Sequence, residues 1–270
     1  MSDPTPSRPA GRPGLLDGPR FALGTLTTLP VRVRRWDRAA ARHGMLWAPS
    51  AGLAVGGAAA LAGVAGTAVG LSPALAAVVA VAVPALLTRA LHLDGLADTA
   101  DGLGSAKPAD EALRIMKRSD IGPFGVVTLL LALGAQVAAL AEAFARSPAQ
   151  GALAALLSAV TARLALTLGA RVGVPAARPE GLGAAVAGTV PRTAALALAV
   201  ALTLAAAAAG LLLDGRIEAL RAAAAVLLGC LAAETLLRRC VRRFSGVTGD
   251  VLGALAETAT TVSLLVLCVG

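Results

Sequence analysis

Long apolar runs, separated by short polar segments, dominate the chain from residue 45 onward. A helix needs about 20 apolar residues to cross the hydrocarbon core of a bilayer. Runs of that length occupy residues 45–70, 72–91, 123–145, 150–174, 193–213, 217–237 and 252–269. The pattern therefore predicts an all-α, polytopic integral membrane helix bundle of about seven transmembrane helices.

The segment before these runs has a different character. Residues 1–20 are rich in proline and lack the apolar core of a signal peptide. This composition is typical of a disordered cytoplasmic tail. We expect residues 21–270 to form a single membrane-embedded domain.

Composition and charge support a membrane protein. The chain is 57% hydrophobic and 15% charged, and its net charge is +8. Most of the 24 Lys and Arg residues fall in the tail and in alternate loops, so the positive-inside rule places the N-terminus and these loops in the cytoplasm. This distribution of positive charge therefore predicts a multi-pass protein of the cell (inner) membrane. Its partner would be the lipid bilayer, and we expect no binding of nucleic acid. Cys230, Cys240 and Cys268 lack the spacing of a zinc site or a disulfide framework.

Three carboxylates lie directly after the second apolar run. Asp94, Asp98 and Asp101 are spaced i, i+4 and i+7, which places them on one face of a helix as an acidic stripe. Like charges at this spacing repel one another, so a bound cation would relieve the stripe. His92 lies roughly opposite the stripe, and we expect it to be structural.

Carboxylate oxygens are the ligands that a hard ion such as Mg²⁺ prefers, commonly together with substrate phosphates. The stripe therefore predicts a magnesium site at the cytoplasmic edge of the bundle. The alternative is a solvated helix surface, which is the usual meaning of such a face in a soluble protein. The adjoining membrane span and the apolar residues within the stripe argue against that alternative.

Basic and glycine-rich segments fall on the same side of the membrane as the acidic stripe. They are typical of a site for a phosphate-bearing substrate, although positive-inside flanking charge explains the basic residues equally well. Asp250 and Glu257 share one helical face at the start of the last span. The candidate substrate-binding residues are Lys117, Arg118, Asp120, Arg178, Glu180, Arg242, Asp250 and Glu257.

Four motifs in order along the chain resemble the cobalamin synthase family, the adenosylcobinamide-GDP ribazoletransferases. They are HLDGLADTADG at 92–102, RIMKRSDIGPFG at 114–125, ARPEGLG at 177–183 and TGDVLGALAE at 248–257. LTTLPV at 26–31 also fits the resemblance. The family usually has Arg in place of Thr28, and an acidic-Ser-basic order where this chain has Arg118, Ser119 and Asp120.

The resemblance implies a Mg²⁺-dependent membrane enzyme of vitamin B12 synthesis. It would join adenosylcobinamide-GDP to α-ribazole, or to α-ribazole 5′-phosphate, and release GMP. Asp94, Asp98 and Asp101 would be the catalytic residues and metal ligands, with Asp98 or Asp101 also able to accept the proton of the attacking hydroxyl. A homo-oligomer, or an association with other enzymes of nucleotide-loop assembly, is compatible with this role.

Two other classes share part of this pattern. The CDP-alcohol phosphotransferases of phospholipid synthesis also use an Asp-rich helix, but the arginine expected after their first Asp-Gly unit is missing here. A cation-coupled transporter would need carboxylates near the middle of the membrane, whereas these cluster at one edge. Both readings remain alternatives to the transferase.

Overall fold

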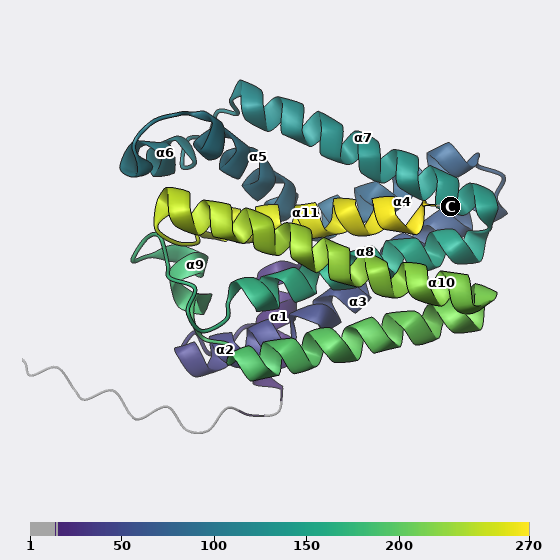
Figure 1. The fold of residues 1–270 in the computed structure, drawn as a ribbon, viewed down its shortest axis with the longest axis horizontal. Coiled ribbons are helices and arrows are strands. Elements are labelled where there is room, and N and C mark those ends of the chain that lie inside the picture. Colours follow the sequence, from purple (N-terminus) through teal and green to yellow (C-terminus); the bar gives the residue numbers. More distant parts are fainter. Residues whose placement is uncertain (1–13, 15, 270) are drawn as a thin grey trace, which may run out of the picture.

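A computed structural model describes residues 14 and 16–269 as a bundle of α-helices, and its described part contains no β-strand (Figure 1). The helices are α1 (Asp17–Leu26), α2 (Arg38–Leu46), α3 (Ala48–Ala68), α4 (Pro73–Leu87), α5 (Leu91–Gly104), α6 (Ala109–Ile115), α7 (Pro123–Arg146), α8 (Pro148–Gly169), α9 (Gly181–Val186), α10 (Arg192–Phe244) and α11 (Gly249–Leu267). The predicted helical class is confirmed.

Five of these helices, α3, α7, α8, α10 and α11, are long and apolar enough to cross a membrane. A sixth span arises if α4 and α5, which meet at 87°, are taken together. α10 contains two non-helical residues, Asp214 and Gly215, where the chain turns back on itself (Figure 1). Each of the seven predicted apolar runs therefore corresponds to a helix or to one arm of α10, and the prediction of a polytopic bundle is confirmed.

The start of the chain is only partly described. Residues 1–13 and 15 of the expected tail lie outside the described residues. Residues 17–20 belong to α1, which packs Phe21 and Ala22 into the core. Helix α1 thus begins at Asp17, within the segment expected to be a disordered tail.

Close packing of the helices depends on small residues, as expected where lipid supplies no hydrophobic drive for association. A Cβ atom at Gly52 would lie 2.7 Å from the Ala159 carbonyl oxygen, and one at Gly56 would lie 3.0 Å from the Leu156 Cα. Glycine at both positions lets the backbones of α3 and α8 approach each other directly.

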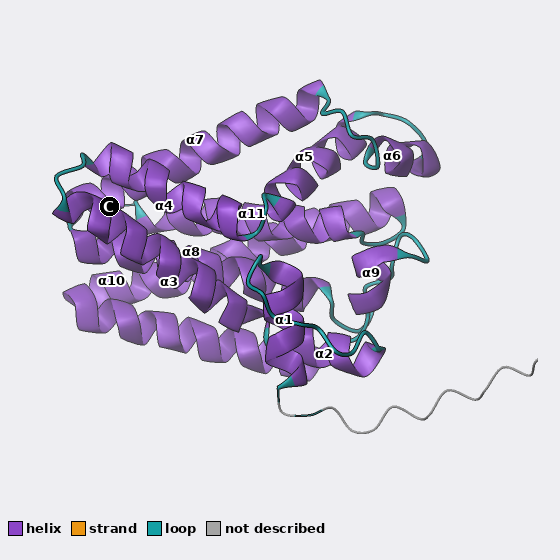
Figure 2. Ribbon diagram, turned by 180° about the vertical axis from the view of Figure 1, so that it is seen from behind, coloured by secondary structure: helices purple, strands orange, loops and turns teal. Residues whose placement is uncertain are grey.

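The two ends of the bundle differ. The short helices α2, α6 and α9 and the C-terminal part of α5 gather at one end, as both views show (Figures 1 and 2). The α7–α8 connection, the turn of α10 and the C-terminus lie at the other end (Figure 1). The polar segments from distant parts of the sequence are therefore brought together at a single end.

Candidate functional site

The break between α4 and α5 positions the acidic helix. Arg89 and Ala90 both adopt left-handed backbone conformations, with φ of 52° and 56°. Such conformations are costly for residues with a side chain, and two in succession turn the chain sharply. The axes of α4 and α5 meet at 87°, and α5 lies at the end of the bundle that carries the short helices (Figure 1). It is not one of the five helices that are by themselves long enough to cross a membrane.

The three carboxylates of α5 have different surroundings. Asp94 is exposed, Asp98 is partly buried and Asp101 is only 6% exposed. The three carboxylates look equivalent in the sequence, but their exposure to solvent decreases from Asp94 through Asp98 to Asp101. The gradient follows from the packing of α5 against both α7 and α11.

Asp101 points toward the N-terminus of α7. Its Oδ2 accepts a hydrogen bond from the Gly122 amide at 2.8 Å, and its Oδ1 accepts one from the Gly125 amide at 2.9 Å. A Cβ atom at Gly122 or Gly125 would lie within 2.6 Å of these oxygens, so glycine is needed at both positions. The first amides of a helix lack partners within it, and a carboxylate there also meets the positive end of the helix dipole. Both Asp101 oxygens are thus engaged by α7.

Asp250 comes from α11 and lies close to α5. A Cβ atom at Gly95 would lie 2.6 Å from the Asp250 carbonyl oxygen, and one at Gly253 would lie 3.3 Å from the Gly95 Cα. These two glycines let α5 and α11 cross with their backbones nearly in contact. We name Asp94, Asp98 and Asp250 the carboxylate cluster.

The members of the carboxylate cluster lie close enough for their charges to influence one another. Burial, together with the charges of Asp94, Asp250 and Asp101, raises the pKa of the Asp98 carboxyl to about 7. The Arg178 guanidinium opposes this rise. A carboxyl that titrates near neutral pH is suited to exchange a proton or to gain a cation.

Two cations border the carboxylate cluster. Arg178 Nη1 lies 3.9 Å from Asp250 Oδ2, while Arg178 Nη2 donates a hydrogen bond to the Leu113 carbonyl oxygen in α6. Lys117 Nζ lies 3.2 Å from Glu180 Oε1, and both side chains are exposed. The ARPEGLG and RIMKRSDIGPFG segments therefore meet across the cluster, as a phosphate site requires.

The other candidate residues at this end are exposed. Arg118 and Asp120 lie in the loop between α6 and α7, and Arg242 lies in the last turns of α10. Among the residues that the structure describes, none of the three forms a hydrogen bond or ion pair with the carboxylate cluster. Their predicted roles in substrate binding remain predictions.

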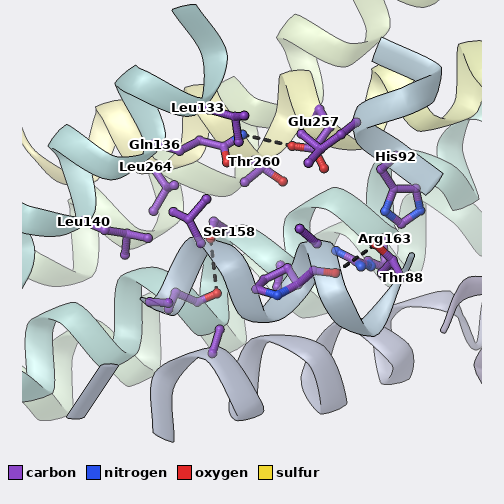
Figure 3. A pocket seen from close by; sticks show the side chains of 18 residues that line it. Thr88, His92, Leu133, Gln136, Leu140, Ser158, Arg163, Glu257, Thr260 and Leu264 are labelled. Atoms are coloured by element: carbon purple, nitrogen blue, oxygen red, sulfur yellow. Dashed lines mark hydrogen bonds between the residues drawn. The ribbon is translucent and has the colours of Figure 1, made fainter. Parts of the chain in front are cut away.

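Glu257 lies two turns further into α11 and faces a different space. Its Oε2 accepts a hydrogen bond from Gln136 Nε2 of α7 at 2.9 Å. Figure 3 shows both side chains on the wall of a pocket inside the bundle, which we call the interior cavity. The polar residues lining it are Thr88, His92, Gln136, Ser158, Arg163, Glu257 and Thr260. Sequence spacing grouped Glu257 with Asp250, but the structure separates them.

Two further cavities flank the carboxylate cluster. One, of about 290 Å³, is lined by four charged side chains, those of Lys117, Arg178, Glu180 and Asp250, together with His92, Thr248 and mostly apolar residues. The other, of about 570 Å³, is lined by residues 24–28, residues 88–91 and Asp94. Leu26 and Leu91 line both cavities. The LTTLPV segment stands out in the sequence only by its resemblance to the family, because nothing in its own residue pattern shows that it folds against the start of α5.

Comparison with known proteins decides between the alternatives. The cobalamin-5-phosphate synthase family matches residues 18–268. A protein of Frankia casuarinae named adenosylcobinamide-GDP ribazoletransferase is 46% identical over 92% of this chain and 93% of its own length. Proteins of the same name from a Nocardioides species and from Bradyrhizobium diazoefficiens are 42% and 39% identical, each over 92% of this chain and over 97% and 91% of their own lengths. No solved structure is significantly similar.

The chain belongs to the cobalamin-5-phosphate synthase family. The match includes all four motifs and every candidate site residue, so the predicted family is confirmed. Membership also decides against a CDP-alcohol phosphotransferase and against a transporter.

The donor set of this family member fits magnesium. Within residues 14 and 16–269, no three His, Cys, Asp or Glu side chains converge into a ready-made metal site. Mg²⁺, however, commonly takes one or two carboxylates and completes its shell with water and substrate phosphates. Asp94 and Asp98 have carboxylates available for this role, whereas the Asp101 carboxylate is already bound by two amides. The carboxylates of the cluster repel one another, and a bound cation would reduce this repulsion.

Proposed function

We propose that this chain is a membrane adenosylcobinamide-GDP ribazoletransferase. It would transfer the cobinamide-phosphate part of adenosylcobinamide-GDP to α-ribazole or α-ribazole 5′-phosphate, with release of GMP. Membership of the family and the shared name of the three relatives support this activity. The observation that carries it is a carboxylate cluster bordered by Arg178 and Lys117 at one end of a membrane bundle.

The chemistry is displacement at phosphorus. The oxygen of a ribose hydroxyl forms a bond to the cobinamide-side phosphorus. The bond from this phosphorus to the bridging oxygen of the diphosphate breaks, and GMP departs with the bridging oxygen. Because one acceptor already carries a phosphate at its 5′ position, the attacking group in that case is another ribose hydroxyl. A carboxylate of the cluster that does not hold the metal is suited to take the proton of this hydroxyl.

Charge neutralisation is the main task of such a site. Mg²⁺ held by Asp94 and Asp98 would offset the negative charge of the phosphoryl oxygens. Arg178 and Lys117 line the adjoining cavity and would hold the departing GMP phosphate. Asp250 keeps Arg178 in place from the side of α11.

We also propose that the protein lies in the cell (inner) membrane with its N-terminus and site in the cytoplasm. The gathering of Lys117, Arg178 and Arg242 at the end of the bundle that carries the carboxylate cluster supports this orientation. Water-soluble nucleotide substrates would then reach the site without crossing the bilayer.

Release of GMP tests the activity directly. The purified protein in detergent should form GMP and a cobalamin product only when adenosylcobinamide-GDP, a ribazole acceptor and Mg²⁺ are all present. Omission of the acceptor is the control for simple hydrolysis. Failure to form product with either acceptor would exclude the proposed function.

A further inference from the structure

The interior cavity contains an arginine, Arg163, that has two buried side-chain nitrogens without a partner among the described residues. Arg163 of α8 is 3% exposed, and its Nε and Nη2 atoms are buried without a hydrogen-bond partner among the described residues. An arginine side chain stays protonated in proteins, so a full positive charge is held between helices of the bundle. An uncompensated charge in this setting is strongly unfavourable.

Glu257 is the carboxylate that lines the same cavity. No direct ion pair joins it to Arg163 in the part of the chain that the structure describes. Figure 3 shows Arg163 beside Thr88 and His92 on one side of the cavity, with Glu257 and Gln136 across it. The charges are therefore complementary but separated by open space.

The walls of the cavity suit water. Arg163 offers donors, and the Nε2 atom of His92 is also buried without a partner. The hydroxyls of Thr88, Ser158 and Thr260 donate to backbone carbonyls of their own helices, which leaves their oxygens free to accept. The cavity leaves about 40 Å³ in which the centre of a water molecule can lie, so it is large enough to admit water.

We propose that the interior cavity holds ordered water that bridges Arg163 to Glu257 and to His92. The bridge links α8 and α11 to α5, two residues before Asp94. Arg163 and Glu257 thus act as positioning residues for the acidic helix. The effect on turnover rests on the proposed function, whereas the effect on stability does not.

A double-mutant cycle on thermal unfolding tests the bridge in purified protein. Arg163→Met and Glu257→Gln should each lower the melting temperature, because each leaves one buried charge without its counterpart. The double variant should lose clearly less than the sum of the two single losses. Strictly additive losses would overturn the proposal.

Turnover per folded molecule separates positioning from plain stability. A small displacement of α5 should lower kcat by about tenfold to a hundredfold in Glu257→Gln. The KM for adenosylcobinamide-GDP should change by less than about twofold, because Glu257 does not line the cavity of about 290 Å³ that contains Lys117 and Arg178. An unchanged kcat would overturn the positioning role even if the stability cycle succeeds.

Glu218→Gln is the matched control. Glu218 is also buried, at 4% exposure, and pairs with Arg221 at 3.3 Å near the turn of α10, at the opposite end of the bundle. The same chemical change there should leave kcat unaltered. A fall in kcat equal to that of Glu257→Gln would show that loss of any buried carboxylate has this effect, and would overturn the proposal.

The identity of the bridging molecules is tested separately. Replacing chloride by gluconate should leave the melting temperature unchanged, and a density map that resolves solvent should show waters between Arg163 and Glu257. A melting temperature that depends on chloride would identify a bound anion and overturn the water bridge.

Discussion

The carboxylate of Asp101 anchors the first turn of α7 through Gly125, whose amide donates a hydrogen bond to Asp101 Oδ1 at 2.9 Å. Asp101 Oδ2 is engaged in the same way by the Gly122 amide. Sequence spacing placed Asp101 with the metal ligands, but in the fold it joins α5 to α7. This arrangement separates the effects expected for the three aspartates of α5.

Asp101→Asn should lower stability. An asparagine has a single acceptor oxygen, so one of the two buried amides would lose its partner, at a cost of about 1–3 kcal/mol. Thermal unfolding in detergent should show a lower melting temperature, whereas Asp94→Asn, at an exposed position, should melt like the parent. If Asp101→Asn melts normally and instead requires more Mg²⁺, Asp101 belongs to the metal site.

Asp94→Asn and Asp250→Asn should impair catalysis without preventing folding. Loss of a carboxylate from the cluster should reduce kcat/KM by about a hundredfold or more, and Asp94→Asn should raise the Mg²⁺ concentration needed for half-maximal rate. Asp110→Asn, an exposed acid in α6, is the control. Near-normal turnover of both cluster variants would remove the carboxylate cluster from the mechanism.

Mg²⁺ affinity should depend on pH around neutrality. The pKa of Asp98 is about 7, so below this pH the carboxyl is protonated and a proton must leave before the metal binds. Affinity should fall by up to about tenfold per pH unit below pH 7 and level off above it. Asp250→Asn removes a charge that raises this pKa, so its profile should shift to lower pH. Identical profiles for the two proteins would contradict the assigned coupling.

Arg178→Met should weaken substrate binding. It removes the charge beside Asp250 and the hydrogen bond to the Leu113 carbonyl oxygen. We expect the KM for adenosylcobinamide-GDP to rise by about tenfold or more, as for loss of one charge-assisted contact. Arg114→Met, at an exposed position of α6, is the matched control. An equal rise in KM for Arg178→Met and Arg114→Met would show that the loss of any positive charge has this effect and that Arg178 makes no specific contact with the phosphate.

The proposed orientation can be measured with single cysteines in a background lacking Cys230, Cys240 and Cys268. Cysteines replacing Lys107 and Ser245 should be protected from an impermeant thiol reagent in intact cells. Cysteines replacing Ala149 and Arg216, at the other end of the bundle, should react. The reverse labelling pattern would place the carboxylate cluster outside the cytoplasm.

Much of this protein follows from its sequence alone. The apolar runs determine the helices that can cross a bilayer, because burial in lipid depends on length and hydropathy more than on distant contacts. Four ordered motifs led to the correct family before any contact was known.

The surroundings of each candidate site residue were decided by tertiary structure. Helical spacing fixes which residues share a face, but not what that face meets. Contact with α7 diverts Asp101 to two backbone amides, and the close crossing at Gly95 and Gly253 brings Asp250 to α5 in its place. Glu257 shares a helical face with Asp250, yet it lines the interior cavity together with Arg163, because a carboxylate's neighbours come from other helices and not from its own.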